Sequence, residues 1–347
     1  MVQMAAAMSR LGTESAFEVL ARANALAAQG KDIINLGIGQ PDFKTPEHIV
    51  EAAIKALRDG HHGYTPANGI PELREAIAGY YKSDYGVDLS PDRVVVTTGS
   101  SAGFLLSFLS AFDPGDRVAL AAPGYPCYRH ILNVLGVSPV SLEAGPAERY
   151  QPTPELLRAA MAEAPLDGLI LASPSNPSGT MLGEAEMREL VDFCAENGIR
   201  LISDEIYQGI TYGARAHTAL EFRDDAVIIN SFSKYFSMTG WRLGWMIMPP
   251  DLVRAVECLA QNLFISPPAV SQYAAVAVFD CDDELQENLK RYAENRKLLL
   301  RELPKAGFDK LASADGAFYI YADVSEMTND SAAFCQAMLA ETGVAAT

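Results

Sequence analysis

Short apolar runs alternate with amphipathic stretches between residues 93 and 248. Each run is rich in Val, Ile and Leu, a pattern typical of a strand buried on both faces. The stretches between most of them have the spacing of helices that cover a sheet. The pattern therefore predicts an α/β fold, with a mainly parallel seven-stranded sheet sandwiched by helices. The predicted strands are 93–97, 118–121, 137–142, 166–172, 199–203, 226–230 and 243–248.

Outside this stretch the pattern is mostly helical. Thr45 followed by Pro46 indicates a helix start, with the threonine as cap and the proline in the first turn. The segment 316–321, G-A-F-Y-I-Y, predicts an edge strand, and G-V-A at 343–345 indicates a further strand. The expected helices are 13–30, 45–60, 71–85, 99–112, 125–135, 154–164, 184–197, 252–263, 269–279, 282–303 and 331–341.

Composition narrows the possible partners and location. The 347 residues include 27 basic and 44 acidic side chains, a formal net charge of −17. This charge argues against binding nucleic acid or an anionic membrane, and no apolar run is long enough to span a bilayer. The five cysteines form no C-x-x-C pair, and the first residues do not resemble a secretory signal. We therefore expect a cytoplasmic protein with reduced thiols.

Polar residues follow four of the predicted strands. They are Ser100, Asn176, Asp204 and Lys234. Because ligands collect at the carboxyl ends of parallel strands, we expect these residues to converge on one crevice. The turn T-G-S-S-A-G at 98–103 precedes a helix, so its free backbone amides can bind a phosphate.

The residue types best suited to a chemical reaction lie in the stretch 231–245, S-F-S-K-Y-F-S-M-T-G-W-R-L-G-W. The amine of Lys234 can condense with a carbonyl, while Ser231 and Arg242 can hold a phosphate. These are the requirements for anchoring pyridoxal 5'-phosphate. An isolated lysine in such a loop would more often be solvated, so the other motifs decide between the two interpretations.

Six motifs occur in the order seen in class I/II aminotransferases, and the chain resembles this family over almost its whole length. They are N-L-G-I-G-Q-P-D-F, Y-T-P-A-N-G-I-P-E-L-R, T-G-S-S-A-G, S-P-S-N-P-S-G-T, D-E-I-Y and S-F-S-K-Y-F-S-M-T-G-W-R-L-G. The resemblance is nearest to the bacterial aspartate-aminotransferase-like branch of the fold-type I pyridoxal phosphate enzymes. It implies an aminotransferase acting on an amino acid and a 2-oxo acid, and a homodimer whose active sites lie at the subunit interface.

The resemblance also assigns roles around the cofactor ring. Lys234 would form the Schiff base and then shuttle protons, and Asp204 would keep the pyridine nitrogen protonated. Tyr207 and Asn176 match the residues that bond the ring's phenolic oxygen. Tyr125 matches the aromatic residue that stacks on the ring. Taken singly, Asp204 is also consistent with a turn cap, Asn176 with a turn and Tyr125 with the core.

Further matches concern the phosphate, the substrate and the domains. Tyr64 would reach the phosphate of the partner subunit, and Gly39 would offer its amide near the substrate carboxylate, close to Tyr125 and Asn176. The resemblance implies a large cofactor-binding domain at 45–285 and a smaller α+β domain from 1–44 and 286–347. The phosphate of the same subunit would be held by Ser100, Ser101, Ser231 and Arg242.

Three functions stay open at this point. The favoured one is an aminotransferase that works by ping-pong double displacement. A carbon–sulfur lyase or a cyclopropane-carboxylate synthase uses the same cofactor and fold. A cofactor-sensing regulatory module is disfavoured because no basic helix-turn-helix segment precedes residue 13. The histidines show no metal-binding spacing, so no metal site is expected.

Two features bear on the substrate. The predicted helix at 99–112 carries no lysine or arginine, which favours neutral or aromatic substrates such as alanine or tyrosine over aspartate. Family members continue past the last helix with an arginine that pairs with the substrate carboxylate, whereas this sequence stops at Thr347. We therefore expect a piece of a longer protein, incomplete in its small domain, that binds the cofactor but transaminates weakly.

Overall fold

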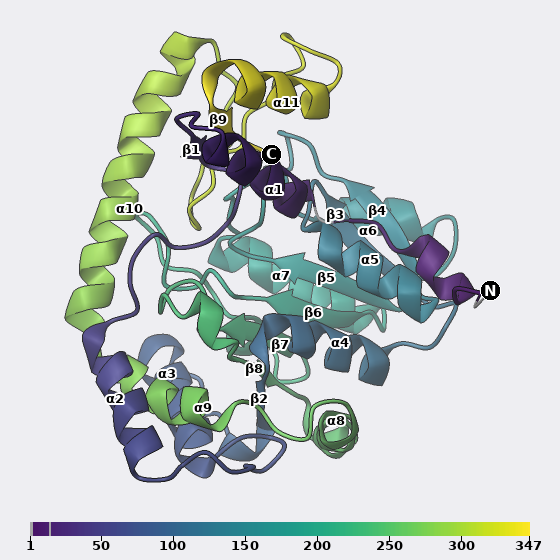
Figure 1. Cartoon of the computed structure of the whole chain (residues 1–347). Helices are drawn as coiled ribbons and strands as arrows, with labels where there is room; N and C mark the ends of the chain where they lie inside the picture. Colours follow the sequence, from purple (N-terminus) through teal and green to yellow (C-terminus); the bar gives the residue numbers. More distant parts are fainter. Residues whose placement is uncertain (1–2, 14) are drawn as a thin grey trace.

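A seven-stranded sheet forms the centre of the molecule. The computed structural model describes residues 3–13 and 15–347. The strand order is β2-β8-β7-β6-β5-β3-β4, and β8 runs antiparallel to both of its neighbours while the other pairs are parallel. The prediction of a mainly parallel α/β sheet is confirmed (Figure 1). The strands are β2 (Val94–Thr97), β3 (Arg117–Ala122), β4 (Ser138–Glu143), β5 (Gly168–Ala172), β6 (Arg200–Asp204), β7 (Val227–Ser231) and β8 (Gly244–Ile247).

Alternate residues of the central strands enter two separate hydrophobic cores. In β7, Ile228 packs into one core, whereas Val227 and Ile229 pack into the other. Every residue of this strand is buried. Burial of one such side chain contributes about 2 kcal/mol, so the sheet is stabilised on both faces. This explains why the sequence shows continuous apolar runs instead of an alternating pattern.

Helices cover both faces of the sheet. The core on one face contains residues from α4 (Gly99–Ala111), α5 (Pro126–Leu135) and α8 (Pro250–Leu263). The core on the other face contains residues from α3 (Pro71–Tyr85), α6 (Pro154–Met161), α7 (Glu184–Glu196) and α9 (Ala269–Val276). None of the helices in the described chain has both the length and the apolar character needed to cross a bilayer.

Residues 34–35 and 344–345 meet in a second, two-stranded sheet. In it β1 (Ile34–Asn35) pairs in parallel with β9 (Val344–Ala345), which confirms the strand expected there. Flanking this pair are α1 (Ser15–Ala28) and α11 (Ser331–Thr342), and α10 (Asp282–Glu302) runs along one side of the molecule (Figure 1). Residue 14, expected in the first helix, lies outside the described residues.

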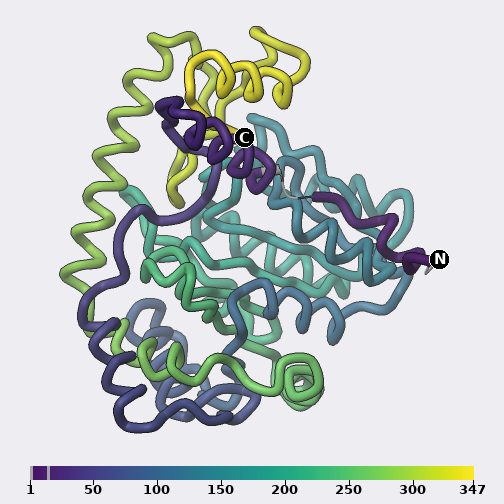
Figure 2. The backbone as a smooth tube through the Cα atoms, viewed as in Figure 1, coloured from purple at the N-terminus to yellow at the C-terminus, as the bar shows by residue number. Residues whose placement is uncertain are grey.

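The remaining helix is α2 (Glu47–Arg58), and short 3₁₀ helices complete the chain. The first of these lies beside α5, whereas α1 lies beside the chain's C-terminal end (Figure 2). The 3₁₀ helices are Ala6–Arg10, Pro91–Arg93, Ala219–Glu221, Thr239–Trp241, Ala277–Asp280 and Leu303–Ala306.

Two local predictions were wrong. The segment 316–321 is not a strand, because Ala317 has a left-handed φ of 58°. The Gly316 amide donates to the Gly179 carbonyl, and the Ala317 amide donates to the Ile210 carbonyl. Because these two carbonyls belong to separate loops, the segment forms no strand ladder. Thr45 does not cap α2, whose cap position is Pro46. The Thr45 hydroxyl instead donates to the Ser237 carbonyl at 2.7 Å.

Candidate active site

The four polar residues expected to converge follow strands that end at one edge of the sheet. Strand β2 runs in the same direction as β7, because both are antiparallel to β8. Asp204 ends β6, and Lys234 follows β7. Asn176 follows β5, and Ser100 lies in the first turn of α4 after β2. Their strands are near one another in the sheet, so the topology places the four residues at the same edge of it.

Asp204 is held in a buried, polar contact with α5. The Tyr128 hydroxyl donates to one carboxylate oxygen, and the Ile206 amide donates to the other at 3.1 Å. Burial raises the pKa of Asp204 to about 6, although these two hydrogen bonds and the Lys234 charge act in the opposite direction. The sequence reasoning missed Tyr128, which lies one helical turn beyond Tyr125.

The Lys234 amine is influenced by the charge of Asp204 and contacts the segment around Gly39. It donates to the Gly39 carbonyl at 2.6 Å. Burial lowers the pKa of Lys234 to about 8, with Arg242 acting in the same direction and Asp204 in the opposite one. An amine with this pKa is partly neutral near physiological pH and can act as a nucleophile or a base.

Aromatic rings surround the Lys234 amine. It lies 5.7 Å from the centre of the Tyr207 ring and 5.8 Å from that of Phe318. The hydroxyl of buried Tyr207 forms a hydrogen bond with the Tyr319 hydroxyl. Phe318 and Tyr319 were missed as site residues, because their segment was interpreted as an edge strand. The only signal in the sequence was a pair of aromatic residues after Gly316.

An anion cradle lies where α4 begins. Gly99 has a left-handed φ of 71°, and a Cβ on it would lie 2.5 Å from the Arg242 guanidinium. A Cβ on Gly244 would lie 2.9 Å from the Ser100 amide nitrogen, so glycine allows α4 to start directly against β8. The two glycines thus bring the Arg242 guanidinium beside the free amides of the helix N-terminus.

The remaining predicted residues differ in their surroundings. Ser231 is buried, and its hydroxyl donates to the Ser233 hydroxyl at 2.9 Å, whereas Ser101 is exposed. Tyr125 immediately precedes α5, and its ring meets the Tyr128 ring edge to face at 5.3 Å. Asn176 is half-buried, and Tyr64 is 85% exposed.

Comparison with known proteins identifies the family. The family model for class I and II aminotransferases matches residues 31–347. This chain belongs to that family. A valine–pyruvate aminotransferase of Mycobacterium tuberculosis is 51% identical over 318 residues, which is 90% of this chain and 81% of the relative. An aspartate aminotransferase of Bacillus subtilis is 33% identical, over 99% of this chain and 90% of the relative.

Solved structures agree with the sequence comparison. A crystal structure of an aminotransferase from M. tuberculosis has a TM-score of 0.96 at 47% identity, covering 99% of this chain and 89% of that chain. Aspartate aminotransferase from Thermus thermophilus with maleate has a TM-score of 0.94 at 31% identity, covering 99% and 91%. The protein is therefore a pyridoxal phosphate-dependent aminotransferase of fold type I.

The site of this aminotransferase fits its cofactor. A buried amine, Lys234, and a buried carboxylate, Asp204, are groups that could bind the aldehyde and the ring nitrogen of this cofactor. The cradle at Gly99, which a Cβ would fill, has a guanidinium and helix amides that could hold the phosphate. Among the described residues, no group of three or more His, Cys, Asp or Glu side chains could hold a metal ion.

Proposed function

We propose that this aminotransferase prefers neutral, apolar amino acids such as alanine, valine or tyrosine to aspartate as amino donors. The observation that carries the proposal is the charge environment of Lys234. Among the described residues, Asp204 and Arg242 are the charged side chains with the largest effects on the pKa of its amine, and both have roles toward the cofactor in this proposal. The nearby walls are aromatic, from Tyr207 and Phe318. Such walls suit an apolar side chain, whereas a second carboxylate needs a further cation.

A second observation supports the same preference. Helix α4 contains no lysine or arginine, and Phe104, Leu106 and Phe108 are buried in the core. The relative that is 51% identical is named a valine–pyruvate aminotransferase. Valine and pyruvate are both small and lack a second carboxylate, as this proposal requires of the substrates.

Each polar side chain has a proposed part in the reaction. When bound, the cofactor supplies an aldehyde that condenses with amines and a ring that accepts electrons. Lys234 would bind it and move protons, and Asp204 would stabilise a protonated ring nitrogen by its charge. Tyr207 and Asn176 would donate to the ring oxygen, and Tyr125 would stack on the ring face. Near the substrate carboxylate, the Gly39 amide would act together with Tyr125 and Asn176.

The phosphate and the assembly complete the proposal. Ser100, Ser101, Ser231 and Arg242 would hold the phosphate, together with the N-terminal amides of α4. A homodimer would bring Tyr64 of each subunit to the phosphate of the other, and 85% exposure in one chain leaves this ring accessible for such a contact. We further infer a large domain at 45–285, a smaller one from 1–44 and 286–347, and a cytoplasmic location that suits five cysteines without a disulfide.

The test is a side-by-side panel of amino donors. Alanine, valine, tyrosine and aspartate are each offered with 2-oxobutyrate, an acceptor that lacks a second carboxylate and is the oxo acid of none of these donors, and kcat/KM is measured. We expect the neutral donors to exceed aspartate by at least about tenfold, since an unpaired carboxylate costs more than 1.4 kcal/mol. Aspartate as clearly the best donor would refute the preference.

A further inference from the structure

Tyr319 joins the two sides of the site. Its hydroxyl bonds to the Tyr207 hydroxyl, and the two rings meet nearly edge to face, with centres 5.5 Å apart. A Cβ on Gly39 would lie 2.2 Å from the Tyr319 hydroxyl, so this hydroxyl also lies directly against Gly39. The Gly39 carbonyl accepts from Lys234. Tyr319 thus lies between Tyr207 and the backbone that contacts the Lys234 amine.

The direction of the hydrogen bond between the two hydroxyls follows from what Tyr207 has to do. A phenol has one proton to donate. If Tyr207 donates to the cofactor's ring oxygen, it cannot also donate to Tyr319. The shared hydrogen bond must then run from Tyr319 to Tyr207.

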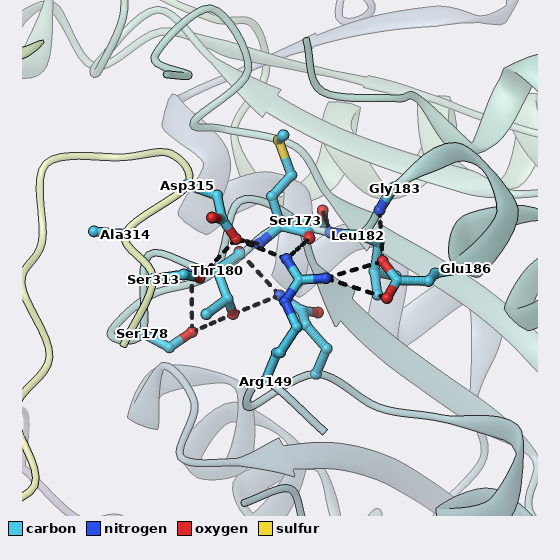
Figure 3. A network of polar contacts seen from close by, with 12 residues as sticks. Arg149, Ser173, Ser178, Thr180, Leu182, Gly183, Glu186, Ser313, Ala314 and Asp315 are labelled. Atoms are coloured by element: carbon cyan, nitrogen blue, oxygen red, sulfur yellow. Dashed lines mark hydrogen bonds and ion pairs between the residues drawn. The ribbon is translucent and has the colours of Figure 1, made fainter. Parts of the chain in front are cut away.

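The segment that carries Tyr319 is held in place from two sides. Asp315 accepts from Arg149 at 2.7 Å and from the Met181 amide at 3.3 Å. Figure 3 shows the Arg149 guanidinium between Asp315 and Glu186, which it contacts at 3.1 Å. On the other side the Tyr212 hydroxyl donates to the Ala317 carbonyl at 2.7 Å.

The backbone of this segment depends on those contacts. Ala314 and Ala317 both have left-handed φ values, 48° and 58°, which non-glycine residues adopt only when their surroundings impose them. Gly179 leaves room for the segment, since a Cβ there would lie 3.1 Å from the Gly316 carbonyl oxygen. The Arg149–Asp315 pair, called the clasp below, is one of the contacts that hold this backbone; Arg296 also donates to the Ala314 carbonyl at 2.6 Å.

We propose that Tyr319 is a positioning residue for Tyr207: it donates to the Tyr207 hydroxyl and so directs the Tyr207 proton toward the cofactor's ring oxygen. The Arg149–Asp315 clasp holds Tyr319 in that position. This inference rests on the proposed role of Tyr207. It explains why two tyrosines far apart in the sequence share one hydrogen bond inside the site.

The test is the pH dependence of the visible absorbance after pyridoxal 5'-phosphate is added to the protein. Tyr319→Phe keeps the ring but removes the donor to Tyr207. Tyr207 would then donate more weakly to the cofactor, and the Lys234 nitrogen would hold its proton more tightly. We expect the absorbance midpoint to rise by about 0.7 pH unit, the size that one hydrogen bond gives.

A double variant separates positioning from a general structural effect. Tyr207→Phe should raise the midpoint further, and adding Tyr319→Phe to it should change nothing more. The matched control is Tyr321→Phe, in the same segment, whose ring packs on Tyr150 and not on Tyr207. It should leave the midpoint unchanged.

The clasp has its own pair of variants. Arg149→Gln should raise the midpoint by less than Tyr319→Phe and speed amide exchange over residues 311–322. Arg188→Gln, which breaks a similarly exposed pair with Glu184, should do neither. Faster exchange with an unchanged midpoint, or no change in either, would refute the role of the clasp.

The outcomes also distinguish this inference from the proposed function. If the unmodified protein with pyridoxal 5'-phosphate shows no absorbance band that depends on Lys234, the proposed roles fail and this inference fails with them. If the band is present but Tyr319→Phe leaves its midpoint unchanged, or shifts it equally in the Tyr207→Phe background, only the role of Tyr319 is refuted.

Discussion

The central sheet and the two-stranded sheet bury their residues very differently. All of β7 is buried, and Trp245 in β8 is fully enclosed. In the two-stranded sheet Ile34 is 58% exposed, and the small core beside it contains Ala23, Leu339 and Ala345 as its buried members. The large sheet therefore has a core of its own, whereas the small one has little apolar contact within this chain.

The active site draws on regions of both kinds. Asp204 and Lys234 extend from the rigid edge of the central sheet, which fixes their positions. Gly39 and Tyr319 come from irregular segments outside that sheet. The comparison teaches that the reactive side chains, Asp204 and Lys234, are attached to the buried edge of the central sheet. The residues that contact or orient them lie in irregular segments held by a few polar contacts. Four experiments can break or sharpen this comparison.

The largest effect is expected at Lys234. Lys234→Ala removes the amine and should abolish amino transfer, while the phosphate cradle still binds the cofactor noncovalently. Borohydride reduction of the loaded, unmodified protein, followed by peptide mapping, should place the cofactor on Lys234. A label on another lysine would contradict the assignment.

Asp204→Asn should lower kcat by at least about a hundredfold. The substitution keeps the shape of the side chain but removes a preorganised charge, which contributes about 3 kcal/mol to stabilising the transition state. Steady-state kinetics measure the effect. Asp225→Asn is a suitable control, since that carboxylate is partly exposed and pairs with Arg223. Near-normal turnover in the Asp204 variant would leave Asp204 with a structural role only.

A third experiment compares the two cores directly. Ile228→Ala in β7 should cost about 3 kcal/mol in the free energy of unfolding, because the packed surroundings cannot collapse around the cavity. Leu339→Ala, equally buried but in the small core, should cost about 2 kcal/mol or less. Urea denaturation measures both, and amide exchange should show the Leu339 effect confined to β1, β9 and α11. Equal, global losses would contradict the proposed difference between the regions.

The smallest effect concerns Glu205, which is fully buried and accepts from Ser203 and Thr218. Burial raises the pKa of Glu205 from 4.5 to about 8, despite these hydrogen bonds. Between pH 4.5 and 8 the folded protein holds a proton that the unfolded chain has lost, so stability falls as pH rises through this window. Glu205→Gln does not titrate there. Relative to this variant, the melting temperature of the unmodified protein should therefore fall by a few degrees from pH 5 to pH 8.

The matching control is Glu72→Gln at the exposed start of α3, which should follow the unmodified protein at each pH. Melting curves of cofactor-free protein measure the effect without interference from the cofactor. Parallel curves for the unmodified protein and the Glu205 variant would show that Glu205 is already ionised in the folded state.

The sequence by itself determined the alternation of strands and helices and the residues that follow each strand. A buried strand needs a continuous apolar run, and a helix over a sheet needs an apolar stripe, so both patterns are local. The motif around Lys234 and the family were predictable for the same reason: the chemistry requires particular residues close together in the chain. The mainly parallel sheet and the expected strand at 343–345 were confirmed.

Only the tertiary structure decided which distant side chains meet. The contacts of Tyr128 with Asp204, of Gly39 with Lys234 and of Tyr319 with Tyr207 join residues far apart in the sequence. None of them leaves a periodic signal, because each depends on how separate elements pack. The segment 316–321 had the composition of a strand. However, its amides donate to carbonyls of the loops beside it, and Ala317 adopts a left-handed backbone conformation. Local propensity was overridden there by hydrogen-bond partners that only the folded chain supplies.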